Sequence, residues 1–166
     1  MKNKNLSFMT QAAMIAAIYV VLTYIFAPFS FGEVQVRISE ALTILPIFTP
    51  AAIPGLFVGC LIGNILGGAI LPDIVFGSIA TLIGAFFTWK LREQKPVVAT
   101  FPPIISNIII VPFVLRYGYG VTLPIPFMML TVGIGEVISC TVLGLIVYGA
   151  LKKYKSTLLS LIHISE

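Results

Sequence analysis

The chain has 166 residues, of which 58% are hydrophobic and only 10% charged, and its mean hydropathy is +1.07. A soluble domain of this size is far less apolar, so the composition predicts an integral membrane protein. Its apolar stretches are too long for barrel strands and lack an alternation of period two, which favours helices. The segments between them are too short to bury a core, so we expect one membrane domain over residues 1–155 and no soluble catalytic domain.

The net charge of +4 follows from where the basic residues lie along the chain. Three clusters flank the apolar stretches, at the start, in a linker and near the end: Lys2 and Lys4; Lys90, Arg92 and Lys95; Lys152, Lys153 and Lys155. If all three clusters are cytoplasmic, only Arg37 and Arg116 lie outside, as the positive-inside rule expects. We therefore predict a multi-pass protein with both termini in the cytoplasm and an even number of spans. The charge requires no nucleic-acid partner.

The first apolar stretch, from Met9 to Ala27, predicts a retained first span rather than a cleaved signal peptide. Four alanines in its inner half lie on one side of the helix as two overlapping AxxxA pairs: Ala12, Ala13, Ala16 and Ala17. Such a smooth face can pack against another helix of the same chain, or it can dock a separate membrane subunit. The residues by themselves leave these two interpretations open.

A polar loop, residues 29–38, leads into a second helix that we expect from Ser39 to Phe48. Ser39 is a candidate N-cap, and Glu40 lies in the first turn, where the helix dipole favours a carboxylate. This helix would be about 15 Å long, too short to cross a hydrocarbon core of about 30 Å. One kinked helix over residues 39–69 is the alternative, but it would place the linker cluster on the opposite side from the N-terminus.

Four further spans are predicted, over residues 54–69, 74–91, 100–115 and 124–151. The first of them carries a glycine at every fourth position, which lets a neighbouring backbone approach closely and predicts a place at the centre of the bundle: Gly55, Gly59, Gly63 and Gly67. Asp73 is expected to cap the next span. The predicted fold is therefore all-α, a polytopic six-helix bundle with a short second helix.

Glu136 is the only carboxylate deep inside a predicted span. Counting about 1.5 Å per residue places it near mid-membrane, at the depth of Asn64 and Asn107. An acid at this depth must be neutral, paired or solvated by a cavity, so it marks a functional site, with a structural hydrogen bond to Asn107 as the alternative. Polar side chains from the outer loops can cover an outward-open pocket as a lid: Glu33, Arg37, Glu40, Arg116 and Tyr119.

The candidate substrate-binding residues combine acids, amides, a cation and an aromatic ring: Glu136, Asn107, Asn64, Glu40, Arg37 and Tyr119. Carboxylates beside amides suit a ligand that presents adjacent N–H donors, such as a guanine-like edge, or a cationic amine. An aromatic ring can stack on such a ligand. Arg37 and Glu40 stand three residues apart, so a local ion pair that holds the lid is the alternative role for these two.

Enzymatic chemistry is not predicted. The sequence offers no nucleophile with a base, no metal-ligand cluster, no paired carboxylates at catalytic spacing and no phosphate loop, so we expect neither a catalytic site nor a cofactor. Cys60 and Cys140 stand singly in apolar surroundings and are predicted to be small packing residues rather than a disulfide or metal ligands. The alternatives to a binding subunit are a stand-alone transporter or channel and, with less support, a lipid-modifying enzyme.

One long run, VQVRISEALTILPIFTPAAIPGLFVGCLIGNILGG, is followed by DIVFGSIATLIGAF and by the glycine-flanked Glu136. Together these segments resemble the QueT family of queuosine-precursor transporters, whose members are similar to the substrate-binding S components of energy-coupling factor transporters. The resemblance covers nearly the whole chain from Thr10 to Lys153. Residues 156–166 do not look like the family, and this tail has no role that its sequence indicates.

The resemblance implies a six-helix protein of the bacterial plasma membrane that captures a 7-deazaguanine, such as preQ0, preQ1 or queuine, from outside the cell. It also implies partners, namely a transmembrane coupling subunit and two cytoplasmic ATPase subunits. Because S components present small residues on their first helix to the coupling subunit, the resemblance favours the docking interpretation of the four alanines. Which acidic residue meets the ligand is not implied.

Overall fold

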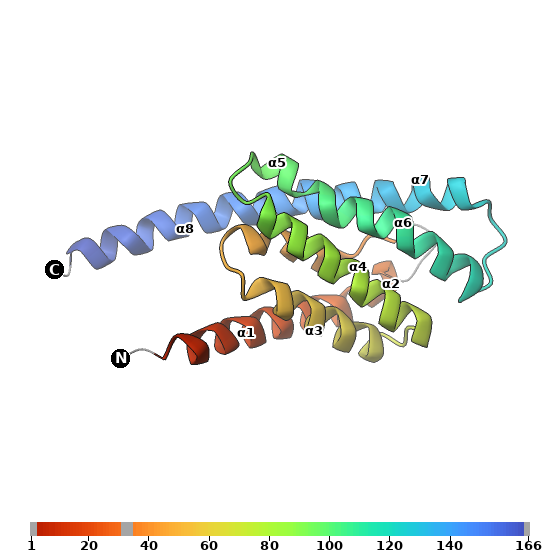
Figure 1. The fold of residues 1–166 in the computed structure, drawn as a ribbon, viewed down its shortest axis with the longest axis horizontal. Helices are drawn as coiled ribbons and strands as arrows, with labels where there is room; N and C mark the ends of the chain where they lie inside the picture. The colour runs from red at the N-terminus through yellow and green to blue at the C-terminus, as the bar shows by residue number, and fades with distance from the viewer. Residues whose placement is uncertain (1–2, 31–34, 165–166) are drawn as a thin grey trace.

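The structure is a computed structural model that describes residues 3–30 and 35–164, with the side chains of the final helix described up to Lys155. All regular elements in these ranges are helical (Figure 1). In chain order they are α1 (Lys4–Ile25), α2 (Ala27–Ser30), η1 (Ile38–Ile47), α3 (Ala52–Leu66), α4 (Leu71–Lys90), α5 (Pro96–Ala99), α6 (Phe101–Tyr117), α7 (Ile125–Glu136), η2 (Val137–Leu143) and α8 (Gly144–Ile164).

The described residues form six helical segments that correspond to the six predicted helices. Four are long and apolar enough to cross a membrane, namely α1, α4, the α5–α6 pair over Pro96–Tyr117 and the continuous α7–η2–α8 helix over Ile125–Lys155. The other two, η1 and α3, are shorter apolar helices. The prediction of an all-α helical membrane bundle with a short second helix is confirmed.

The short second helix differs in detail from the prediction. It is a 3₁₀ helix that begins at Ile38, and Arg37 occupies the N-cap position without a side-chain cap. The prediction that Ser39 caps it is wrong, because Ser39 already lies inside the helix and accepts a hydrogen bond from the hydroxyl of Thr23 at 2.9 Å. With a rise of about 2 Å per residue, η1 is still too short to cross a bilayer.

The centre of the bundle is η1. The glycines had predicted α3 at this place, and that prediction is wrong. The helix η1 touches six other elements, α1, α3, α4, α5, η2 and α8, and residues 39–44 are all buried. By contrast, α3 packs on α1, α4 and η1 and keeps apolar side chains such as Ile65 on the outside. A stripe of small residues fixes a close contact with one neighbour, and it does not require that the helix be surrounded.

The glycines of α3 do allow one helix to approach closely, and that helix is α1. A Cβ atom at Gly55 would lie 2.7 Å from the carbonyl oxygen of Ala12, and one at Gly59 would lie 2.8 Å from Cβ of Tyr19. The same seam continues at Gly63, which faces Thr23. The seam therefore positions Tyr19 against the interior, where it reaches the central helix η1.

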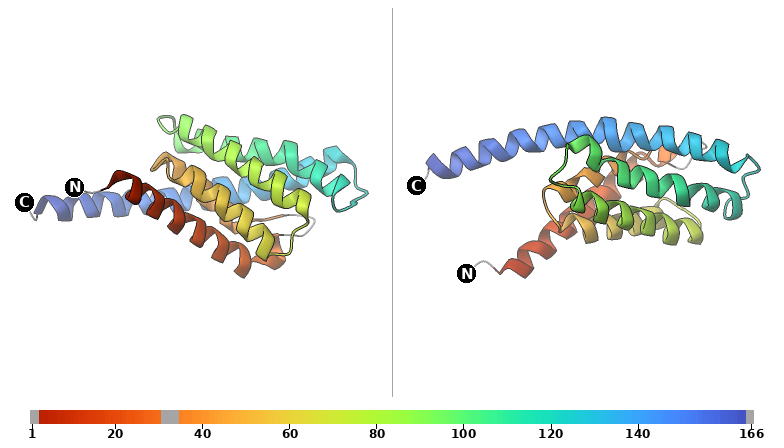
Figure 2. Two further views of the ribbon diagram at one scale, coloured as in Figure 1. Left: turned by 60° about the horizontal axis from the view of Figure 1, so that its bottom comes forward. Right: turned by 45° about the horizontal axis from the view of Figure 1, so that its top comes forward.

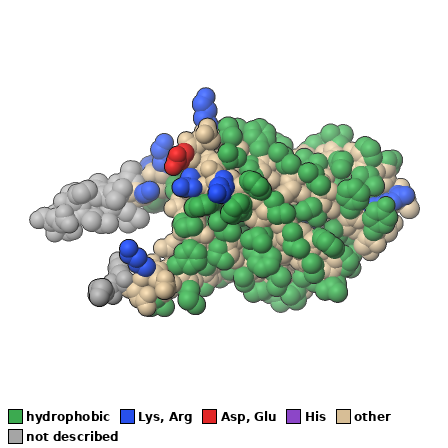
Figure 3. All heavy atoms as spheres, viewed as in Figure 1, with side chains coloured by type: hydrophobic (Ala, Val, Ile, Leu, Met, Phe, Trp, Pro, Cys, Tyr) green, Lys and Arg blue, Asp and Glu red, His purple; other side chains and the backbone are tan. Residues whose placement is uncertain are grey.

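Both chain ends lie at the same end of the bundle, and α8 extends beyond it there (Figures 1 and 2). The loop between α4 and α5 lies at that end too, and Lys and Arg side chains gather around it (Figure 3). Apolar side chains cover the middle of the visible face. This arrangement agrees with an even number of spans and with three basic clusters on one side of a membrane.

Candidate functional site

Four charged side chains are buried among the helices, although charged residues are costly at such positions. Arg37, Glu40, Asp73 and Glu136 are each at most 4% exposed. They come from the segment before η1, from η1 itself, and from α4 and α7. Glu40 had been predicted in an outer lid, and its placement inside the bundle corrects that expectation. The lid interpretation fails for Glu40 because η1 folds inward and becomes the centre of the bundle.

Glu40 and Glu136 form what we call the carboxylate pair. One carboxylate oxygen of each acid and the sulfur of Cys140 lie within 4.8 Å of one another. Cys140 is one helical turn after Glu136 and donates its S–H to Oε2 of Glu136 at 3.3 Å. The two acids stand far apart in the sequence, so their spacing along the chain did not reveal the pair. Carboxylates and a thiol at this separation are also the kinds of side chain that bind metal ions.

Uncharged donors from neighbouring helices hold each member of the pair. Oε1 of Glu40 accepts hydrogen bonds from the hydroxyl of Tyr19 in α1 and from that of Thr81 in α4, the latter at 3.4 Å. Oε2 of Glu136 accepts from the amide of Asn107 in α6 at 3.0 Å. The predicted proximity of Asn107 and Glu136 is therefore seen in the structure, and donors from three helices orient the two carboxylates.

Glu40 keeps one oxygen atom that is not satisfied by these donors. Its Oε2 is buried, and no described residue donates a hydrogen bond to it. A buried acceptor without a donor is costly, so such an atom often marks a place where a ligand supplies the missing hydrogen bond.

A second polar group lies nearer the outer end and is centred on an ion pair. Arg37 donates to both carboxylate oxygens of Asp73 at 3.3 Å and to Oε1 of Gln35 at 3.5 Å. The prediction that Asp73 caps α4 is wrong, because Ile70 holds the cap position and no side chain caps the helix. Asn64 belongs to this group, since its amide donates to the backbone carbonyl of Asp73 at 3.3 Å.

Tyr119 ties the loop between α6 and α7 to the same ion pair. Its hydroxyl donates to Oδ2 of Asp73 at 2.9 Å. Partial burial of the ring, together with the negative charge of Asp73, raises the pKa of Tyr119 to about 12. Arg116, by contrast, is exposed and donates to the carbonyls of Val121 and Leu123 in its own loop. Of the predicted outer-loop residues, Tyr119 therefore reaches the buried group, and Arg116 does not.

Gly135 links the segment before η1 to the carboxylate pair. A Cβ atom at Gly135 would lie only 2.2 Å from the carbonyl oxygen of Gln35, so the absence of a side chain lets this segment lie directly on α7. The neighbouring residue is Glu136, which faces the pair. Glu33, which had been predicted in the lid, lies outside the described residues.

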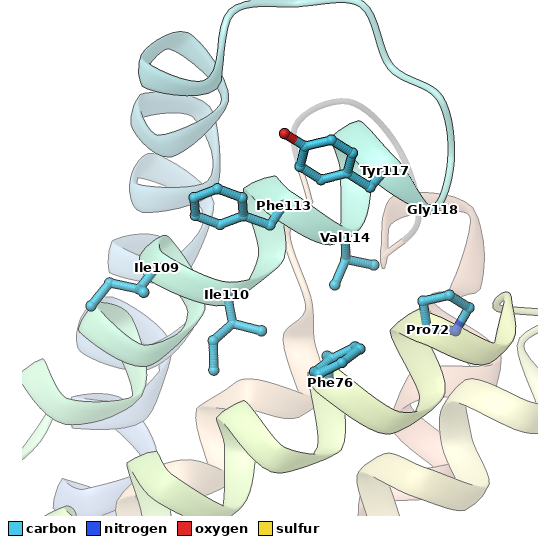
Figure 4. A pocket seen from close by; sticks show the side chains of 8 residues that line it. All are labelled: Pro72, Phe76, Ile109, Ile110, Phe113, Val114, Tyr117 and Gly118. Atoms are coloured by element: carbon cyan, nitrogen blue, oxygen red, sulfur yellow. The ribbon is translucent and has the colours of Figure 1, made fainter.

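An apolar groove lies elsewhere. It has a volume of about 490 Å³ and runs between α4 and α6 near their outer ends, where Pro72, Phe76, Phe113 and Tyr117 line it (Figure 4). None of its lining residues carries an acid or an amide. A surface of this kind suits lipid chains, whereas a polar ligand needs the hydrogen-bonding groups of the interior.

Comparison with known proteins adds an independent finding. The family described as "QueT transporter" matches residues 9–153, which is most of the chain. The chain belongs to the QueT transporter family. It is therefore related to transporters and not to enzymes.

A curated relative of this QueT family member is the "Queuosine precursor transporter QueT" of Lactococcus lactis subsp. cremoris (strain MG1363). The two are 33% identical over 84 residues, a segment that covers 49% of this chain and 48% of the relative. The matched segment thus spans about half the length of the relative. No solved structure matches the chain.

The four alanines of α1 divide into two pairs in this QueT family member. Ala12 and Ala16 face the glycines of α3, and Ala16 is buried. Ala13 and Ala17 are exposed on the outside of the bundle. The sequence pattern had suggested one smooth face of four residues, but neighbouring positions on a helix point about 100° apart, so a single packing contact covers only part of it.

Three residues that bind the buried charged side chains were not predicted from the sequence. Tyr19 and Thr81 bond Glu40, and Asp73 carries the ion pair. The available signal was positional, since Tyr19 lies three residues after Ala16 on the same helix face and Thr81 lies four after Gly77. Cys60 and Cys140 are buried free cysteines. Their contacts with Asn64, Thr81 and Glu136 show that they also pack against polar groups.

Proposed function

We propose that this QueT family member is the substrate-binding membrane subunit of an energy-coupling factor transporter and that it imports a queuosine precursor. The ligand would be a 7-deazaguanine such as preQ0, preQ1 or queuine. The observation that supports this proposal is the buried group of carboxylates and amides, Glu40, Glu136 and Asn107, inside the bundle of a transporter-family protein. Carboxylate oxygens accept the N–H donors that a guanine edge or a cationic amine presents, and buried partners left unpaired by a wrong ligand give strong discrimination.

The two polar groups take different roles in this proposal. The carboxylate pair and Asn107 contact the ligand. Arg37, Asp73, Asn64 and Tyr119 close the outer side, because they join the segment before η1, the start of α4 and the α6–α7 loop. Ligand entry then requires these hydrogen bonds to open, since the carboxylate pair lies buried beneath them.

The proposal includes partners and an orientation. The protein lies in the bacterial plasma membrane with both termini in the cytoplasm. A transmembrane coupling subunit binds the outward face of α1 at Ala13 and Ala17, and two ATPase subunits supply the energy. The exposure of these two alanines, and the basic side chains at the end that carries both termini, support this arrangement.

Ligand binding by the purified full-length chain in detergent tests the proposal. Calorimetric titration with a panel of 7-deazaguanines should show saturable binding, and adenine should not bind because it presents a different hydrogen-bonding edge. Absence of binding to every 7-deazaguanine would overturn the proposed substrate. Uptake by cells that express the chain alone, compared with cells that also express a coupling module, tests the proposed partners.

A further inference from the structure

The charges buried in the bundle do not balance. Three acids, Glu40, Asp73 and Glu136, and one base, Arg37, are buried among the described residues. Every other described Lys or Arg side chain is exposed. Arg37 pairs with Asp73 at 3.3 Å, so the described part of the chain holds two more buried acids than buried bases. Acids in a low-dielectric interior are stable only when a cation, a proton or hydrogen-bond donors compensate them.

The geometry of the pair fits one small cation. An ammonium group donates two hydrogen bonds of about 2.8 Å at a tetrahedral angle, which bridges two oxygen atoms about 4.6 Å apart. One oxygen of Glu40 and one of Glu136 lie within 4.8 Å of each other. Oε2 of Glu40, buried and without a donor among the described residues, offers a place for one of these bonds.

We propose that the carboxylate pair binds a protonated amine of the ligand, so that the site selects cationic 7-deazaguanines over neutral ones. This inference rests on the proposed function and adds the charge of the substrate to it. A 7-deazaguanine with an aminomethyl group, or with a secondary amine as in queuine, carries such a cation. One with a nitrile, as in preQ0, does not.

The hydrogen bonds around the pair favour an amine over a divalent metal. Tyr19, Thr81, Asn107 and Cys140 all donate to the two carboxylates, and they leave few lone pairs for a metal ion. A hard divalent ion needs six or more oxygen ligands, whereas an ammonium needs two or three acceptors. The donors therefore orient the carboxylates for a ligand that brings its own N–H groups.

The test compares three ligands of nearly equal size on the full-length protein in detergent that contains EDTA. They are 7-deazaguanines with an aminomethyl, a hydroxymethyl or a cyano group at the same position. The aminomethyl compound should bind about tenfold more tightly than the other two, or better, because a hydrogen bond to a charged group is stronger than one to a neutral group. The hydroxymethyl compound is the matched neutral control.

The variant Glu40→Gln tests whether Glu40 discriminates charged from neutral ligands. This variant keeps the side-chain size but removes one charge, and it should bring the ratio of the aminomethyl to hydroxymethyl affinities close to one. Glu93→Gln, at an exposed position in the linker, should keep the ratio of the wild type. Gel filtration and the melting temperature show whether each variant is folded, and the affinity ratio is compared only within folded protein.

The possible outcomes of the ligand comparison lead to different conclusions. Equal affinities for the three compounds would overturn the charge selection and leave the proposed function standing. Binding of the aminomethyl compound that is lost in EDTA and restored by a divalent ion would replace the amine by a metal site. Binding of none of the three would overturn the proposed function itself, together with this inference.

Discussion

At the scale of single residues, the buried acids are the most informative feature of this protein. Glu136 stood out in the sequence because it is a carboxylate within a long apolar stretch, and the structure gives it the predicted partner Asn107. Glu40 was expected in the first turn of a helix at the outer lid, yet it is fully buried and lies beside Glu136. The difference arises because depth in a bundle depends on where a short helix folds, which local sequence does not specify.

Replacing Glu136 tests its place in the site. Glu136→Gln removes the charge and turns one acceptor oxygen into a donor, so the affinity for the ligand should fall by more than about tenfold. Calorimetric titration of the purified variant measures this change. Glu93→Gln makes the same chemical change at an exposed position and should bind like the wild type. An unaltered affinity in the Glu136 variant would remove this residue from the binding site.

The raised pKa of Tyr119 predicts how the stability of the protein depends on pH. Its pKa is raised to about 12, whereas the tyrosines of an unfolded chain lose their proton near about pH 10. Between these two values unfolding releases a proton, so the stabilisation from Tyr119 falls as the pH rises. Below about pH 9 both states are protonated, and the contribution is constant.

The measurement is the melting temperature of wild type and Tyr119→Phe from pH 8 to pH 12. The difference in melting temperature between the two proteins should be constant near pH 8 and should decrease toward pH 12, because phenylalanine has no proton to lose. Parallel curves over the whole range would show that the hydrogen bond to Asp73 does not hold this proton.

At the scale of elements, the contact between α1 and α3 determines which side of α1 is available to other proteins. The glycines of α3 take up Ala12 and Ala16, and this contact directs Ala13 and Ala17 outward. The glycine spacing predicted a close contact correctly. It did not identify the partner helix, because any helix with a smooth face satisfies the same pattern.

Two double variants separate docking from internal packing. Ala13→Leu with Ala17→Leu enlarges the exposed pair and should abolish uptake by the complete transporter while ligand binding by the isolated chain stays unchanged. Ala12→Leu with Ala16→Leu forces bulk into the α1–α3 contact and should destabilise the fold by about 1–3 kcal/mol or more. Uptake assays, titrations and melting temperatures distinguish these results. Lost ligand binding in the first variant would assign Ala13 and Ala17 to internal packing.

At the scale of the whole molecule, the basic residues and the chain ends share one side. Lysines and arginines gather near the end from which the two termini emerge (Figures 1 and 3), and Arg116 lies in the last turn of α6. The positive-inside rule therefore predicts that the end with the termini faces the cytoplasm. The buried polar groups join η1 with segments near the other end.

Cysteine labelling in intact cells tests the orientation. A cysteine at Gln94, in the exposed linker after α4, should react with a membrane-impermeant maleimide only after the cells are opened. A cysteine at Thr122, in the loop between α6 and α7, should react in intact cells. Cys60 and Cys140 are buried and give little background. The reverse pattern would show that the protein is inserted the other way.

The sequence by itself determined the membrane class, the all-helical fold, the common side of both termini and the proximity of Glu136 to Asn107. These follow from hydropathy, charge placement and the cost of a buried acid, which are properties of local sequence. Only the tertiary structure decided that η1 is the centre, that Arg37 pairs with Asp73 and that Glu40 meets Glu136. These features depend on which helices become neighbours, and that choice depends on packing among segments far apart in the chain.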